Sequence, residues 1–151
     1  MDKKYASGWT ESDGGKAFFI HHRVRYADTD KMNMVYHGSY IPMLEAARVD
    51  TLREIGWVYD EMEKAGVLLP VVDLSVKYFM PARYDQILRI ETHVIEAPTS
   101  RLKFSFSIFH ELTLLVKAEV CLAFVGASTS RPTRAPEALI ESLEQHSLIH
   151  Y

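Results

Sequence analysis

The sequence predicts an α+β domain with an antiparallel sheet, on three observations. One strand-like segment comes first, one long amphipathic helix follows it, and four strand-like segments then succeed one another through short connections. A helix of about twenty residues is about 30 Å long, which is enough to cover one face of a twisted sheet of five strands. We therefore expect a five-stranded antiparallel sheet wrapped around one long helix, with a short second helix and a C-terminal helix.

The first half of the chain supplies the first strand and the long helix. Residues 1–16 lack periodicity and contain three glycines, so they are expected to form a flexible N-terminal arm. Residues 17–26 are rich in aromatic and β-branched side chains, which favours a strand. Residues 36–55 repeat apolar side chains at spacings of three and four, which predicts the long helix. That stripe consists of Tyr40, Leu44, Ala47, Thr51 and Ile55.

The second half of the chain reads as sheet, with a helix on either side of it. A short helix is expected over residues 58–65, before the sheet, and a closing helix over 136–146, after it. Between them, apolar and alternating patterns predict four strands. Those strands are expected at residues 68–78, 87–95, 102–109 and 114–125.

Composition limits the class of protein. The chain has 151 residues, 48% of them hydrophobic and 25% charged, which suits one domain over residues 17–151. The formal net charge of −3 argues against a nucleic-acid partner. A single cysteine, Cys121, indicates a reducing compartment, and no apolar run approaches the roughly 20 residues that cross a bilayer. The N-terminal lysines precede no apolar stretch, so we expect no secretory signal, no membrane insertion and a cytoplasmic protein.

Several kinds of site are missing from the sequence. It contains no glycine-rich phosphate loop, no G-x-S-x-G nucleophile elbow and no S-x-x-K motif. Cys121 falls in the middle of a predicted strand, where a buried and inert thiol is expected. The seven histidines form no metal-binding pattern, since His21 and His22 are adjacent in a strand and point to opposite faces. We therefore expect no metal site.

The segment between the first strand and the long helix is the best candidate for chemistry. Asp30 lies just before the helix, where unpaired backbone N–H groups and the positive end of the helix dipole are close. The same N–H groups can stabilise an oxyanion, so Asp30 is placed to attack a carbonyl or to activate water towards it. His37, seven residues later, could orient the acid or the substrate. Asp28 and Asp30 are also ordinary turn and capping residues, and on pattern alone capping is the simpler reading.

The same segment resembles the signature of hot-dog-fold acyl-CoA thioesterases of the 4-hydroxybenzoyl-CoA thioesterase-like family. The signature is an aspartate loop, a Val-Tyr-His sequence and a helix that carries aromatic and acidic residues. The resemblance extends over about residues 18–136. Its matching segments are residues 28–30, 35–37, 39–40, 45–48, 76–78, 81–85 and 131–136.

The resemblance implies roles for particular residues. Asp30 would be the catalytic carboxylate, as nucleophile or as general base, and the His37 backbone N–H would polarise the thioester carbonyl. Asn33 stands where the family often has glycine, and asparagine tolerates the left-handed conformation that such a turn needs. Basic residues at strand ends would meet the phosphates of coenzyme A, and the candidates are Arg83, Arg101, Lys103 and Arg131. The candidates that would line the acyl pocket are Met34, Tyr36, Met43, Trp57 and Phe79.

The resemblance also implies an assembly and a reaction. Members of the family work as homodimers with sites between the subunits, often paired into tetramers, and they need no metal or other cofactor. The function expected is hydrolysis of an acyl-CoA to a free acid and coenzyme A. Two alternatives stay open: a hot-dog dehydratase acting on hydroxyacyl thioesters, and a non-catalytic module that binds acyl thioesters.

Overall fold

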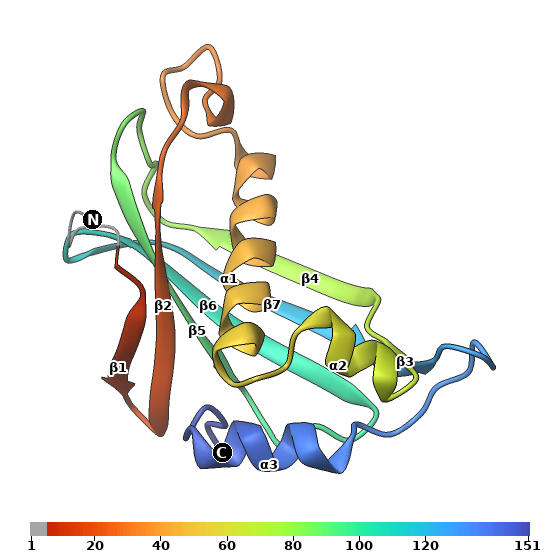
Figure 1. Cartoon of the computed structure of the whole chain (residues 1–151). Helices are drawn as coiled ribbons and strands as arrows, with labels where there is room; N and C mark the ends of the chain where they lie inside the picture. The colour runs from red at the N-terminus through yellow and green to blue at the C-terminus, as the bar shows by residue number, and fades with distance from the viewer. Residues whose placement is uncertain (1–5) are drawn as a thin grey trace.

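The computed structural model describes residues 6–151, and its centre is one antiparallel sheet (Figure 1). The strands lie in the order β1-β2-β5-β6-β7-β4, and every neighbouring pair is antiparallel. Hairpins join β5 to β6 and β6 to β7, because these strands are consecutive in the chain and are antiparallel neighbours in the sheet. The bounds are β1 Gly8–Ser12, β2 Gly15–Arg23, β4 Val71–Tyr78, β5 Ile87–Val94, β6 Arg101–His110 and β7 Thr113–Ala123.

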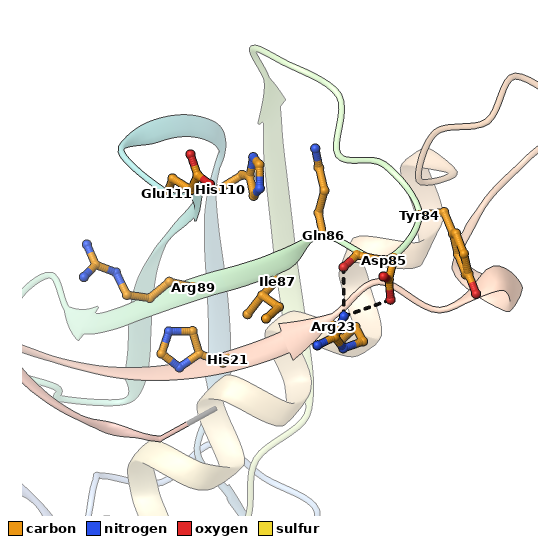
Figure 2. Close-up of a pocket in the computed structure, with 9 residues that line it drawn as sticks. All are labelled: His21, Arg23, Tyr84, Asp85, Gln86, Ile87, Arg89, His110 and Glu111. Atoms are coloured by element: carbon orange, nitrogen blue, oxygen red, sulfur yellow. Dashed lines mark hydrogen bonds and ion pairs between the residues drawn. The ribbon is translucent and has the colours of Figure 1, made fainter. Parts of the chain in front are cut away.

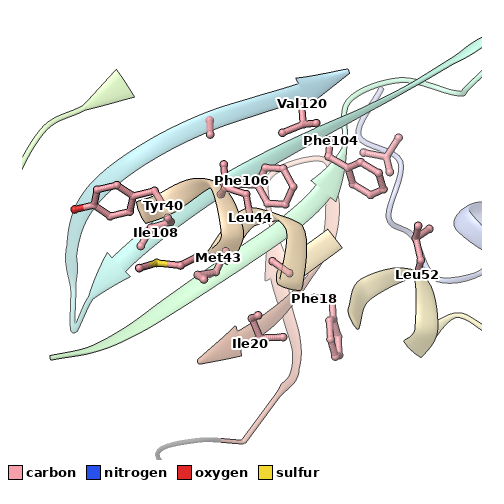
Figure 3. Close-up of a cluster of buried hydrophobic side chains, with 14 of the residues drawn as sticks. Phe18, Ile20, Tyr40, Met43, Leu44, Leu52, Phe104, Phe106, Ile108 and Val120 are labelled. Atoms are coloured by element: carbon pink, nitrogen blue, oxygen red, sulfur yellow. The ribbon is translucent and has the colours of Figure 1, made fainter. Parts of the chain in front are cut away.

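The long helix α1, Tyr40–Glu54, lies across the concave face of the sheet (Figure 1). Six of its residues are at most 7% exposed: Tyr40, Met43, Leu44, Ala47, Thr51 and Leu52. Figure 3 shows four of them, Tyr40, Met43, Leu44 and Leu52, together with aromatic and branched side chains of the strands. Those strand residues include Phe18, Ile20, Phe104, Phe106, Ile108 and Val120, which all belong to the same buried cluster. The predicted helix face is therefore confirmed as the centre of the core.

Three shorter helical or paired segments complete the fold. Helix α2, Tyr59–Lys64, follows α1 and leads into β3, Val67–Leu68, which pairs with β8, Val125–Gly126, as a second small sheet. Helix α3, Glu137–Gln145, closes one end of the large sheet (Figure 1). In residues 6–151, no helix is both long and apolar enough to span a membrane.

The expected α+β class is confirmed, but the sheet has six strands and not five. The additional strand is β1, which pairs with β2 from Gly8 opposite Phe19 to Ser12 opposite Gly15. The expected loose arm therefore does not extend over residues 8–16, and residues 1–5 lie outside the described part of the chain. β1 is held by the ladder and by Trp9, whose ring lies 5.2 Å from that of Phe18.

Two element boundaries also differ from expectation. Residues 36–39 are not α-helical: His37–Ser39 form the short 3-10 helix η3, and α1 begins at Tyr40. The expected strand over 68–78 is divided into β3 and β4 around Pro70, because proline has no N–H to give to a ladder.

The C-terminal residues fold back along β5. The Val94 N–H donates to the Leu148 carbonyl at 2.9 Å, and the His150 N–H donates to the Val94 carbonyl at 2.8 Å. The imidazole rings of His93 and His150 stack at 3.8 Å. Burial, together with the neighbouring charges of His150 and Lys117, lowers the pKa of His93 from 6.5 to about 4.

The lowered pKa of His93 leads to a pH-dependent stability. Between pH 6.5 and 4, His93 is mostly protonated in the unfolded chain and mostly neutral in the folded protein. The free energy of unfolding therefore falls as the pH falls through this window. We expect a loss on the order of 1 kcal/mol between pH 6.5 and 5, and a smaller loss in His93→Gln. Urea unfolding of both proteins at a series of pH values measures it. Equal pH dependence in the two proteins would contradict this account.

Candidate active site

The loop between β2 and α1 presents Asp30 and is closed by its own hydrogen bonds. The Asp30 N–H donates to the Met34 carbonyl at 2.9 Å, and the Met32 N–H donates to Asp30 Oδ1 at 2.8 Å. Thr29 and Val35 form an antiparallel bridge across the base of the loop. The second carboxylate oxygen, Oδ2, accepts no hydrogen bond from residues 6–151. Half-buried Asp30 therefore keeps one oxygen available to a substrate or a water molecule.

Asn33 occupies the turn of this loop in the conformation expected for it. Its φ angle is 61°, in the left-handed region, and its N–H donates to the Asp30 carbonyl at 3.3 Å. Asparagine is one of the few side chains that this region tolerates. Asparagine at position 33 is thus compatible with the turn.

The turn gives a prediction about Asn33. Asn33→Gly should leave stability and activity near those of the wild type, because glycine adopts a positive φ without a steric penalty. Asn33→Val should cost roughly 1–2 kcal/mol of stability and should reduce activity, because a β-branched side chain is strained there. Thermal unfolding and steady-state kinetics of the two variants measure the difference. Equal behaviour of the Gly and Val variants would be inconsistent with a strained turn.

Asp28 has a different environment from Asp30 although only one residue separates them. It ends the 3-10 helix η2, Tyr26–Asp28, and is 4% exposed. Its carboxylate accepts hydrogen bonds from the Arg25 backbone and side chain and from His22. Burial alone would raise the pKa of this carboxyl group, but the bonds from Arg25 and His22 outweigh it and lower the pKa from 3.8 to about 2. Asp28 was expected to be a capping residue, and no pattern in the sequence indicates this network.

The short 3-10 helix η3, which leads into α1, offers unpaired backbone donors next to the loop. The backbone N–H groups of His37 and Gly38 donate to no acceptor within residues 6–151. The His37 carbonyl accepts a hydrogen bond from the Tyr78 hydroxyl at 2.8 Å, which ties the helix start to the edge strand β4. A Cβ on Gly38 would lie 2.9 Å from Tyr36 Cε2, so glycine allows the Tyr36 ring to pack there. Unpaired backbone donors at a helix start can stabilise an oxyanion.

Asp30 and His37 line the same groove, which has a volume of about 510 Å³. Its walls are largely apolar and come from the loop, the start of α1 and the end of β4. The other lining residues are Met32, Met34, Val35, Tyr40, Tyr78, Phe79, Met80 and Pro81. A carboxylate, unpaired N–H donors and apolar walls are thereby combined at one place, as hydrolysis of an apolar thioester requires.

The candidates for binding substrate divide into two groups. Arg83 lies at the loop, where its Nη1 donates to the Asn33 carbonyl at 3.4 Å. Arg101 and Lys103 lie at the start of β6, at the opposite end of the sheet from the Asp30 loop, and Lys103 is paired with Glu96 at 2.9 Å. Within one chain the structure therefore does not bring Arg101 or Lys103 to the groove.

The candidates for the acyl pocket are also divided. Met34 and Phe79 line the groove. Tyr36 is 48% exposed beside His37 and is not part of the groove wall, and Met43 belongs to the core. Trp57 lines a separate apolar cavity of about 270 Å³ between α1, α2 and β3. Within residues 6–151, no three His, Cys, Asp or Glu side chains gather as a metal site.

A larger hollow, of about 700 Å³, lies on the opposite face of the sheet from α1 (Figure 2). His21 and Arg89 point into it from β2 and β5, while the alternate residues Ile20 and Ile90 face α1. Its charges are largely paired: Arg23 donates to Asp85 at 2.9 Å, and Arg89 contacts Glu91 at 2.8 Å. The hollow lacks the combination of a free carboxylate and helix-start donors that the smaller groove has.

The fold is that of a thioesterase-like protein, and comparison with known families agrees. Residues 24–143 match the model of the Thioesterase-like superfamily, so the chain belongs to that superfamily. Its α+β architecture is the expected hot-dog fold.

Relatives with names and structures lie within the same class. The chain is 33% identical over 124 residues to the acyl-CoA thioester hydrolase YbgC of Escherichia coli O157:H7, covering 82% of this chain and 92% of the relative. It is 30% identical over 126 residues to the acyl-CoA thioesterase YbgC of Haemophilus influenzae, covering 83% and 91%. A solved structure of a DHNA-CoA thioesterase from Staphylococcus aureus superposes with a TM-score of 0.77 at 30% identity, covering 84% and 88%.

Proposed function

We propose that this protein is an acyl-CoA thioesterase that converts an acyl-CoA and water into a free carboxylic acid and coenzyme A. One observation carries the proposal: Asp30 and His37, whose backbone N–H has no acceptor within residues 6–151, line the same largely apolar groove. Membership of the thioesterase-like superfamily and the names of the relatives support the acyl-CoA substrate.

The proposed reaction uses groups of this chain alone. The thioester carbonyl oxygen accepts a hydrogen bond from the His37 N–H, which stabilises the charge that develops there. Asp30 either activates a water molecule or attacks the carbonyl carbon directly, and water then releases the acid. In both routes the C–S bond breaks, and the departing thiolate takes a proton that comes from the water molecule consumed in the reaction. Neither route needs a metal or another cofactor. Arg83, beside the loop, is proposed to meet the coenzyme A phosphates.

The test is a substrate panel of aromatic, short-chain and long-chain acyl-CoAs together with a hydroxyacyl-CoA. Thiol release with an equal amount of free acid from at least one acyl-CoA is the expected result. Formation of an enoyl thioester without thiol release would instead identify a dehydratase. Tight binding of acyl-CoAs with no turnover across the panel would identify a binding module. Either of these outcomes overturns the proposal.

We further propose that the active form is a homodimer assembled through α1 and β4. β4 is an edge strand whose outer side has no partner in residues 6–151, and Val71 and Val72 on it are about half exposed. On the adjacent helix, Arg48 is half-buried and has no ion pair within residues 6–151, and burial lowers its pKa while Glu45 opposes that effect. Across a two-fold axis, each exposed Glu45 can pair with the Arg48 of the second copy.

Such a dimer gives the two distant basic residues a possible role. Arg101 and Lys103 can contribute to coenzyme A binding only if the substrate is held mainly by the other subunit. A further pairing of dimers into tetramers is part of the same proposal.

We also propose that the protein works in the cytoplasm. The free thiol of Cys121 is consistent with that reducing compartment.

A charge exchange on α1 checks the proposed interface. Arg48→Glu should raise the dimer dissociation constant at least about tenfold, because like charges then face each other across the two-fold axis. The double variant Glu45→Arg/Arg48→Glu should restore dimerisation. Arg134→Glu, the same charge change at an exposed position outside α1 and β4, should have no effect. Sedimentation velocity of the four proteins measures this, and a wild-type protein that is monomeric at micromolar concentration would contradict the proposed dimer.

A further inference from the structure

An ionic cluster of His22, Arg25 and the buried Asp28 carboxylate lies where β2 leads into the Asp30 loop. His22 Nε2 lies 2.9 Å from Asp28 Oδ2, and Arg25 Nη2 lies 2.8 Å from Asp28 Oδ1. The Arg25 backbone N–H also donates to Asp28 Oδ2, at 2.9 Å. The Asp28 side chain is 5% exposed, against 24% for that of His22 and 67% for that of Arg25. One carboxylate therefore joins the end of β2 to the beginning of the loop.

The backbone of Asp28 joins the same loop to the start of the helix. Its carbonyl accepts a hydrogen bond from the Tyr36 N–H at 2.9 Å, immediately before His37. The Val35 N–H donates to the Ala82 carbonyl at 2.8 Å, which fixes the far side of the loop. Asp28 is thus bonded through its side chain to β2 and through its backbone to the residue preceding the oxyanion donors. Asp30 lies between these two attachments.

The Asp28 cluster is expected to add little to the stability of the fold. The desolvation of two charges commonly cancels most of their attraction, so a buried ion pair is weak evidence for stabilisation. Its geometry, however, is strongly directional, since the hydrogen bonds to both oxygens allow one orientation of the carboxylate. We therefore expect the cluster to affect the geometry of the following loop more than the stability of the fold.

We propose that His22, Arg25 and Asp28 act as positioning residues that hold the Asp30 carboxylate in register with the N–H groups of His37 and Gly38. This inference rests on the proposed thioesterase function. Asp28 carries most of the effect because it makes every bond of the cluster, and His22 carries more than Arg25 because it is less exposed. None of the three residues lines the groove, so they act through Asp30 and not on the substrate.

The principal test is Asp28→Asn, which keeps the shape of the side chain and removes its charge. We expect kcat to fall about 10- to 100-fold, because small displacements of a reacting group have effects of that size. The dissociation constant of a non-hydrolysable acyl-CoA thioether should stay within about twofold. Assays are run well below the melting temperature of each variant, so that the protein is folded. Asp85→Asn, which changes an exposed carboxylate on a neighbouring loop, is the matched control and should be near wild type.

Two further measurements separate positioning from a purely structural role. In Asp28→Asn, the Asp30 and Met32 amides should exchange with solvent at least about tenfold faster, because their loop bonds are loosened. His22→Gln keeps a donor for Asp28 and should retain more kcat than His22→Leu at equal folded fraction.

These measurements test the positioning role separately from the proposed thioesterase function. Wild-type kcat in folded Asp28→Asn would overturn the positioning role, and so would a lower kcat with unchanged amide exchange. A wild-type protein without thioesterase activity would overturn the proposed function, while the exchange rates would still show whether the cluster orders the loop.

Discussion

We expect kcat for acyl-CoA hydrolysis to fall at least about 100-fold when Asp30 is replaced by asparagine. An amide can neither attack the thioester nor accept a proton from water, and a positioned base or nucleophile contributes at least this much. Asparagine retains an oxygen that can accept the bond from the Met32 N–H, so the loop should keep its shape. The loss should therefore appear in kcat, with little change in the binding of an acyl-CoA analogue.

The matched control for this variant is again Asp85→Asn. Asp85 is an exposed loop carboxylate with a φ angle of 69°, a conformation that suits asparagine, and it is paired with Arg23. This control should keep nearly full activity. Activity near wild type in Asp30→Asn would remove Asp30 from the chemistry, and an equal loss in Asp85→Asn would indicate a general effect of charge.

The largest expected effect on stability comes from Leu122→Ala. Leu122 lies on β7 opposite Leu102 and is 0% exposed within the core. Truncation removes buried methyl groups and leaves a cavity, which costs about 2–5 kcal/mol of the free energy of unfolding. Leu112→Ala makes the same change in the β6–β7 turn, where the side chain is 97% exposed, and should change stability by less than about 0.5 kcal/mol.

Chemical denaturation of the two leucine variants gives the comparison directly. A cost below about 1 kcal/mol for Leu122→Ala, or similar costs for the two variants, would contradict the assignment of the core.

Periodicity in the sequence predicts α1 and the strands β5, β6 and β7 because each has one face buried. Leu102, Phe104, Phe106 and Ile108 alternate along β6, and all four are at most 1% exposed. β1 has no such pattern, and Gly8 and Ser12 at its two ends have low β-propensity. It is a strand because β2 offers it a free edge, and local sequence carries no signal for that pairing.

The candidate site was predictable where it depends on chain order. Chain order places Asp30 and His37 beside the same helix start, but on pattern alone capping was the simpler interpretation. Their proposed roles came from the resemblance to hot-dog thioesterases. Hairpin order also implies that β6 begins at the end of the sheet far from this loop, which argues against Arg101 and Lys103 in the same chain. The bond between His22 and Asp28 could not be predicted, because it depends on the path of the backbone after β2.

The most direct test of the account is a crystal structure with an acyl-CoA analogue in which a methylene group replaces the sulfur and the carbonyl remains. We expect the carbonyl oxygen about 3 Å from the His37 backbone nitrogen and the carbonyl carbon within about 3.5 Å of an Asp30 carboxylate oxygen. An analogue whose carbonyl instead lies in the hollow around Arg89, on the other face of the sheet, would contradict the account (Figure 2).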